Sequence, residues 1–236
     1  MMRFVLPLIL VPSLTVADEA EDRFVEANLL SVFYHELGHA MIDVLALPVF
    51  GQEEDAADVA SILMIDAFYD DDVALDLAYD TAFGFWAEAE LADGAVYWDV
   101  HGPDAQRFFN TVCLFYGADP EGRSEFAEDM DLPEARAETC PEEYDLAIDS
   151  WGAALDQIAG AGDSLRFDAG TDTSLTAELI AAEVMALNAD FTFPHVIGII
   201  VAPCGEANAF YDPNTVEITM CSEFEDHLRA LYAVID

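Results

Sequence analysis

Two histidines and a glutamate in the N-terminal part of the chain have the spacing of a catalytic metal site. They are His35, Glu36 and His39, within the sequence FYHELGHAMID. Residues four apart share one face of an α-helix, so both imidazoles can bind one ion at about 2.0–2.1 Å. Glu36 projects beside them and can accept a proton from a water on that ion. The pattern predicts one Zn²⁺ ion at a site that activates water.

A catalytic zinc site needs a third protein ligand, and acidic residues follow the histidines closely. The segment EEDAAD begins fourteen residues after His39, at the start of a second expected helix. Glu54 can supply the third ligand, and Asp58, one turn later, can accept the outer N–H of a ligating histidine. Glu53 is the rival ligand, but one turn after it stands Ala57, which can hold nothing. The register therefore favours Glu54.

Other interpretations of these residues stay open or are excluded. The chain has no histidine six residues after His39, which excludes the metzincin class. An amphipathic helix that carries the motif without a metal remains the alternative. Gly38 is consistent with a close helix contact, because glycine costs about 0.5–1 kcal/mol against alanine inside a helix. Neutral tolerance of Gly38 in a strong helix is the other explanation.

The elements expected around this motif are mostly helices, followed by a small β element. Apolar periodicity and the positions of Gly and Pro predict helices at 21–47, 53–69, 73–92, 104–116, 142–159 and 175–189. The apolar run 196–201 predicts a strand, and 208–211 with 216–220 predicts a hairpin. We therefore expect a single α+β domain at 18–236, mainly helical, with a C-terminal antiparallel β element.

The N-terminus has the layout of a cleaved secretory signal, with cleavage after Ala17. Its apolar run is short for a membrane span and is broken by Pro7 and Pro12, although a retained anchor is the alternative. No other segment is apolar enough to cross a bilayer. We expect an exported protein, periplasmic or secreted, without stable membrane insertion.

The four cysteines agree with an oxidising compartment. Three pairings are possible, and we favour Cys113 with Cys140 and Cys204 with Cys221, because each pair brackets a compact segment. No C-x-x-C spacing is present, so a zinc knuckle or a thioredoxin-like motif has no support.

The formal net charge of −41 arises from 48 acidic residues against seven arginines, without any lysine. This charge excludes nucleic acid and anionic membrane surfaces as partners. Solubility at high ionic strength, where salt screens self-repulsion, explains such acidity without any specific partner.

The motif residues resemble the gluzincin metallopeptidases, which include the thermolysin-like enzymes. The resemblance covers His35-Glu36-x-x-His39, Glu54-x-x-Ala57-Asp58 and the acidic Asp43. The segments HELGHAMIDVLALPVFGQEEDAAD, FFNTVCLFYGADP and CGEANAFYDP are similar to a bacterial metallopeptidase family of unknown function. In patches, this similarity spans most of the mature chain. It implies a zincin-like fold, zinc and peptide substrates, but no particular specificity.

One departure from the gluzincin pattern concerns the strand that pairs with substrate. In gluzincins an Asn-Ala-Phe-aromatic edge strand precedes the metal-binding helix, whereas Asn208, Ala209, Phe210 and Tyr211 follow it here. We expect a circular permutation that places this segment beside the helix as a substrate-binding edge. An ordinary hairpin closed by Cys204 and Cys221 is the alternative.

The predicted activity is zinc-dependent hydrolysis of peptide bonds with Glu36 as general base. The donor to the oxyanion is open among His101, His195, Tyr79, Tyr116 and Tyr211. A zinc-bound but catalytically silent exported domain that binds peptides or proteins is the main alternative, and an acidic module without metal is a third. No nucleophile elbow and no phosphate-binding loop is present.

Overall fold

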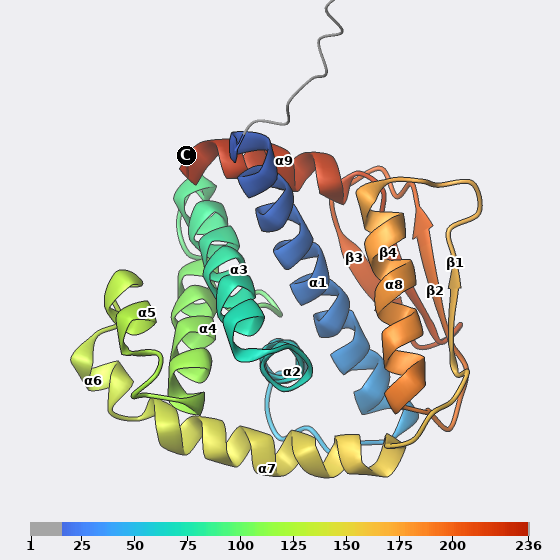
Figure 1. Cartoon of the computed structure of the whole chain (residues 1–236), viewed down its shortest axis with the longest axis horizontal. Helices are drawn as coiled ribbons and strands as arrows, with labels where there is room; N and C mark the ends of the chain where they lie inside the picture. The colour runs from blue at the N-terminus through green and yellow to red at the C-terminus, as the bar shows by residue number, and fades with distance from the viewer. Residues whose placement is uncertain (1–15, 236) are drawn as a thin grey trace, which may run out of the picture.

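A long helix, α1 (Val16–Val44), runs through the middle of the protein (Figure 1). The computed structural model describes residues 16–235, so the predicted signal peptide at 1–17 lies almost wholly outside the described residues. On one side of α1 lie α2 (Glu53–Phe68), α3 (Asp71–Leu91) and α4 (Asp104–Ala118). On the other side lie α8 (Leu175–Asp190) and a sheet.

The remaining helices close the edges of this arrangement. They are α5 (Ser124–Asp129), α6 (Glu134–Ala137), α7 (Cys140–Ile158) and α9 (Phe224–Ile235). The C-terminal helix α9 crosses one end of α1 and α3, while α7 runs along the opposite end of the molecule (Figure 1).

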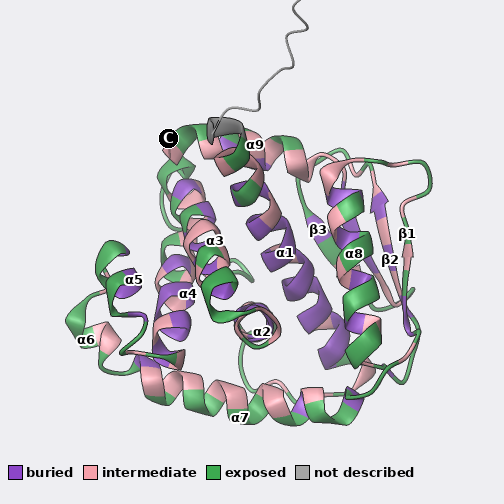
Figure 2. Ribbon diagram, viewed as in Figure 1, coloured by how far each residue is buried: buried purple, intermediate pink, exposed green. Residues whose placement is uncertain are grey.

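The helix α1 is buried along most of its length, as its purple colour shows in Figure 2. Phe24, Leu29, Phe33 and Met41 have no exposed surface. Helices α2, α3, α8 and α9 and strands β3 and β4 all contact it. A helix that is apolar on nearly every side is stable only when other elements surround it. The motif helix is therefore the core of the fold, and His35, Glu36 and His39 line a cavity beside it.

Gly38 lies where α1 crosses α2. A Cβ atom placed on Gly38 would lie 3.1 Å from Ala60 Cβ and 3.2 Å from Ala57 Cα. The missing side chain therefore lets the two helix backbones approach closely, which agrees with the close-packing explanation of this glycine. As a result, the acidic first turn of α2, which also suits the positive end of its dipole, lies beside the histidines.

The sheet has four strands in the order β1-β2-β4-β3. Strand β1 (Leu165–Asp168) is parallel to β2 (Ile197–Ala202), which is parallel to β4 (Glu217–Cys221). Strand β3 (Ala209–Asp212) pairs antiparallel with β4 and forms an edge of the sheet. This edge packs against α1.

The expected fold class is confirmed, because the protein is mainly helical with a small C-terminal sheet. The expectation of an antiparallel β element is correct for the hairpin but wrong for the sheet as a whole, which is mixed. The parallel pairs are β1 with β2 and β2 with β4, and β1 itself was not predicted from the sequence pattern. Two of the four residues of β1, Arg166 and Asp168, are charged, and so it lacks an apolar run.

Both expected disulfides are present. Cys113–Cys140 joins α4 to the start of α7, and Cys204–Cys221 joins the end of β4 to the loop that leads into β3. In the part of the chain that the structure describes, no helix has both the length and the apolar character needed to cross a bilayer.

Candidate metal centre

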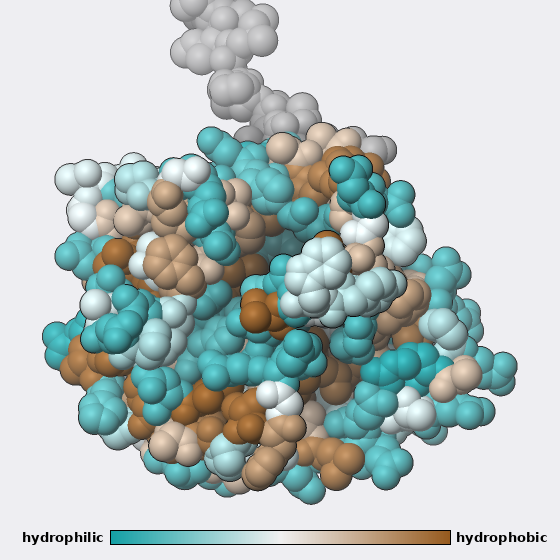
Figure 3. Space-filling view, turned by 180° about the vertical axis from the view of Figure 1, so that it is seen from behind, coloured by the Kyte–Doolittle hydropathy of each residue, from teal (hydrophilic) through white to brown (hydrophobic). Residues whose placement is uncertain are grey.

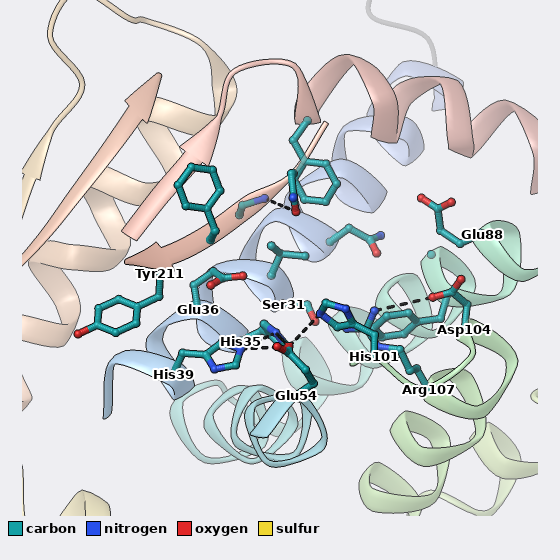
Figure 4. A pocket seen from close by; sticks show the side chains of 18 of the residues that line it. Ser31, His35, Glu36, His39, Glu54, Glu88, His101, Asp104, Arg107 and Tyr211 are labelled. Carbon is teal, nitrogen blue, oxygen red and sulfur yellow. Dashed lines mark hydrogen bonds and ion pairs between the residues drawn. The ribbon is translucent and has the colours of Figure 1, made fainter. Parts of the chain in front are cut away.

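Three side-chain atoms from α1 and α2 converge on one point. His35 Nε2 and His39 Nε2 are 3.1 Å apart, and each is 3.2 Å from Glu54 Oε2 (Figure 4). Ligands arranged tetrahedrally at about 2.05 Å from a zinc ion are about 3.3 Å from one another. The three atoms therefore lie at separations that allow them to bind one metal ion.

The outer nitrogens of both imidazoles are held by carboxylates. His35 Nδ1 lies 2.7 Å from Asp58 Oδ1, and His39 Nδ1 lies 2.9 Å from Glu53 Oε1. These carboxylates can accept the Nδ1 protons, so in a neutral ring, the form that binds a metal, the lone pair of Nε2 would face the shared point. Either a proton or a metal ion between the two Nε2 atoms suits their separation of 3.1 Å. Glu53, the rival ligand in the sequence, holds His39 from outside.

Asp58 is itself fixed by an arginine of α4. Arg107 donates from Nε to Asp58 Oδ2 and from Nη2 to Asp58 Oδ1, both at 2.8 Å, and its guanidinium stacks over the Phe85 ring. Burial alone would raise the pKa of Asp58, but the charge of Arg107 and the hydrogen bonds from His35 and Arg107 hold this pKa well below its usual range. Asp58 therefore stays ionised and keeps His35 oriented.

Arg107 was not foreseen as part of the site. Its signal in the sequence is only that arginine is rare in this chain, with seven arginines against 48 acidic residues. A buried arginine needs carboxylate partners, but the sequence does not say which of the many acidic residues provides them.

Glu36 lies on the same helix, 6% exposed, and lines the cavity in front of the three donor atoms. In Figure 4 it lies between the histidines and Tyr211 of β3. Burial is the largest influence on Glu36 and raises its pKa, although the two histidines and a backbone hydrogen bond at Tyr211 oppose the rise. Glu36 does not belong to the group of three donor atoms, and it lines the cavity beside them.

This cavity has a volume of about 770 Å³ and lies between the helices and the edge of the sheet. Asn208, Ala209, Phe210 and Tyr211 line it on one side, although they lie some 170 residues after Glu36 in the chain. The Tyr211 hydroxyl donates to Asp43 Oδ2 at 2.6 Å, which ties β3 to the last turn of α1. The fold thus brings the Asn208–Tyr211 segment and the motif helix to the same cavity, although they lie far apart in the sequence.

The residues considered as oxyanion donors lie in different places. His101, in the loop between α3 and α4, lines the cavity, with Nε2 2.8 Å from Glu54 Oε2 (Figure 4). Tyr211 also lines the cavity, but its hydroxyl is bound to Asp43. Tyr79 donates to Asp129, outside the residues that line the cavity. His195 and Tyr116 are not among the lining residues either.

Hydrogen bonds from His101, His35 and His39 hold the pKa of Glu54 well below its usual range. The third donor is therefore an ionised carboxylate, whose negative charge favours a bound cation. The site combines two imidazoles, one carboxylate and a separate buried glutamate, a set that metal-dependent hydrolysis uses.

The sequence matches the model of one protein family, DUF4344, described as "Putative metallopeptidase", over residues 13–155 and 169–234. The chain belongs to this family. No curated protein and no solved structure matches the chain. The matched region contains the whole donor set, Glu36 and the edge strand, so the family description agrees with the chemistry of the site.

Proposed function

We propose that this protein is a zinc-dependent peptidase of gluzincin type. The observation that carries the proposal is the convergence of His35, His39 and Glu54 within hydrogen-bond distance, with Glu36 beside them in an open cavity. Membership of a metallopeptidase family supports a metal and a protein or peptide substrate.

Zn²⁺ held by His35, His39 and Glu54 would lower the pKa of a bound water molecule and polarise the scissile carbonyl. Glu36 accepts a proton from the water as its oxygen bonds to the carbonyl carbon. Glu36 then gives that proton to the amide nitrogen as the C–N bond breaks. Because burial raises its pKa, Glu36 is a stronger base than an exposed glutamate and accepts a proton more readily.

The substrate backbone is positioned by the edge strand β3. This strand pairs with β4 on one side, and its residues Ala209 and Phe210 line the cavity. An extended peptide can add to such an edge through main-chain hydrogen bonds. A circular permutation relative to gluzincins accounts for the late position of this strand in the chain.

His101 is the best-placed donor for the oxyanion. Its imidazole lines the cavity beside Glu54, and its side chain is 45% exposed, so it can turn toward a substrate. Tyr211, the other candidate donor that lines the cavity, has its hydroxyl bound to Asp43. His101 therefore completes the set of groups that hydrolysis requires.

Two disulfides support export to the periplasm or to the outside of the cell, with residues 1–17 as a cleaved signal. Disulfides persist in oxidising compartments and are rare in the cytosol of mesophiles.

The test compares cleavage of a diverse peptide library by the purified protein and by Glu36→Gln, read by mass spectrometry. Glu36→Gln keeps the three donor atoms, so both proteins should hold one zinc ion while only the wild type forms products. If both hold zinc and neither cleaves, the protein is a zinc-bound binding domain and the peptidase proposal is overturned.

A further inference from the structure

A second cavity, of about 380 Å³, adjoins the cavity of the metal centre. It lies beneath the loop that joins α3 to α4. His101, Asp104 and Arg107 line both cavities, so the two spaces meet at these side chains. In Figure 4 these three side chains lie on the side of the metal centre away from Tyr211 of β3.

The walls of the second cavity are small and mostly apolar. Ala89, Ala92, Ala95, Val96 and Pro103 line it. Side chains of this size leave room for a long, thin aliphatic chain and offer no hydrogen-bonding groups along it.

The polar groups of the second cavity are mainly negative. Asp99 and Asp104 line it, with side chains 54% and 35% exposed. Asp99 Oδ1 accepts the backbone N–H of His101 at 3.3 Å, and Asp104 lies 3.7 Å from Arg107 Nη1. The positive charge of Arg107 is already used by the two-point contact with Asp58. The cavity thus pairs apolar walls with an excess of carboxylate.

We propose that the second cavity is a subsite for an arginine or lysine side chain of the substrate polypeptide. This inference rests on the proposed peptidase function and names its substrate class. The aliphatic stem of the side chain packs on the alanines, and the cationic head forms charge-assisted hydrogen bonds with Asp99 and Asp104. An acidic side chain is repelled there, and a short apolar one gains no ion pair with the carboxylates.

The charge of the whole molecule acts in the same direction. A net charge of −41 attracts basic polypeptides over the distance that salt permits. Long-range attraction of this kind is not specific, whereas the two carboxylates of the subsite select one position in the substrate. A preference for arginine or lysine at one position of the substrate therefore distinguishes the subsite from attraction by the net charge.

The test uses the zinc-loaded Glu36→Gln variant, so that binding is measured without cleavage. The probes are fluorescein-labelled alanine-based peptides with a single arginine placed at each position in turn. Each has a counterpart with citrulline, which has nearly the same shape without the charge. We expect arginine to bind roughly fivefold tighter than citrulline at one position, the effect of one partly exposed ion pair.

Matched variants assign this preference to the second cavity. Asp99→Asn should abolish most of the arginine preference, and Ala95→Phe, which fills the cavity without changing its charge, should do the same. Asp93→Asn removes the same charge from the same loop, but Asp93 does not line either cavity. It should therefore keep the preference.

Equal affinities for arginine and citrulline at every position overturn the inference. So does a preference that Asp93→Asn reduces as much as Asp99→Asn, because the general field then explains it. Cleavage of the peptide library by the wild type is an independent observation. It would still support the proposed function if the arginine preference were missing, and its absence would not remove a measured preference.

Discussion

Single side chains decide how firmly the metal centre is held. Asp58 Oδ1 lies 2.7 Å from His35 Nδ1, and both Asp58 oxygens accept hydrogen bonds from Arg107. The carboxylate thereby fixes the tautomer of His35 and the direction of its Nε2 lone pair. A residue outside the candidate donor set is therefore expected to influence how strongly the site binds a metal.

Replacement of Asp58 should weaken the binding of zinc. We expect Asp58→Asn to lower zinc affinity about 10–100-fold, because the amide is a weaker acceptor for the His35 proton. Competition with a chromogenic chelator measures this affinity. Asp66→Asn is the matched control, since Asp66 lies on the same helix and pairs with Arg123 away from the site. Equal zinc affinities in the two folded variants would contradict this role of Asp58.

The sequence pointed to three residues that the fold brings together, His35, His39 and Glu54, but not to Arg107 behind them. Spacing on one helix face brings His35 and His39 together, and the register of the second helix distinguishes Glu54 from Glu53. Arg107 and His101 reach the site through the loop and helix that follow α3, and that placement depends on tertiary packing. A chain with 48 acidic residues offers too many partners for an arginine to be assigned from sequence.

At the scale of elements, the site depends on the close crossing of α1 and α2. This crossing carries Glu54 to the histidines, and Gly38 is the residue at the contact. A methyl group at Gly38 would push the helices apart by a few tenths of an ångström, because its neighbours include the backbone of Ala57.

Gly38→Ala should therefore lower the free energy of unfolding by about 1–3 kcal/mol and weaken zinc binding. Gly152→Ala is its control, since Gly152 lies within α7 and a Cβ there meets nothing within 4 Å. That control should gain about 0.5–1 kcal/mol from its better helix propensity. Chemical denaturation measures both changes. Equal stabilisation by the two substitutions would show that α1 and α2 are not in close contact at Gly38.

The hydrogen bond from Tyr211 to Asp43 holds the edge strand beside α1. Burial and the neighbouring Asp43 carboxylate raise the pKa of Tyr211, so its proton is retained. Tyr211→Phe should raise KM for peptide substrates roughly fivefold, the effect of about 1 kcal/mol, while zinc content stays unchanged. Asp43→Ala removes the acceptor of the same hydrogen bond and should raise KM by a similar factor. A KM that stays unchanged in Asp43→Ala while Tyr211→Phe raises it would argue against this contact.

Elements were predictable where the sequence pattern was strong. The expected helices at 53–69 and 175–189 correspond to α2 and α8 within one residue at each end. By contrast, β1 has four residues of mixed character, and its strand conformation depends on pairing with β2. The helix α9 was not predicted, although it is amphipathic and buries Leu228 and Leu231 on one face.

At the scale of the whole molecule, the dominant feature is negative charge. The face in Figure 3 mixes hydrophilic side chains with several hydrophobic groups. With 48 acidic residues on a chain of 236, carboxylates lie close to one another, and some are forced into partly buried positions. Asp80 is one of these, with a pKa that burial raises to about 6.

Asp80 makes part of the stability depend on pH. Its folded-state pKa is raised, so the folded protein binds this proton more tightly than the unfolded chain does. The corresponding stability is present in full below about pH 4 and is lost as the pH rises through about 6. Asp80→Asn should therefore lose less stability than the wild type between these values. Urea unfolding at both pH values measures this, and parallel losses in the two proteins would contradict the assignment to Asp80.

The most direct test of the metal centre is the zinc content of the purified protein and its variants, measured by elemental mass spectrometry. We predict one zinc ion per chain in the wild type and in Glu36→Gln, and little zinc in His35→Ala, His39→Ala or Glu54→Ala. Wild-type protein that takes up no zinc, or histidine variants that keep it, would contradict the assignment of His35, His39 and Glu54 as the metal ligands.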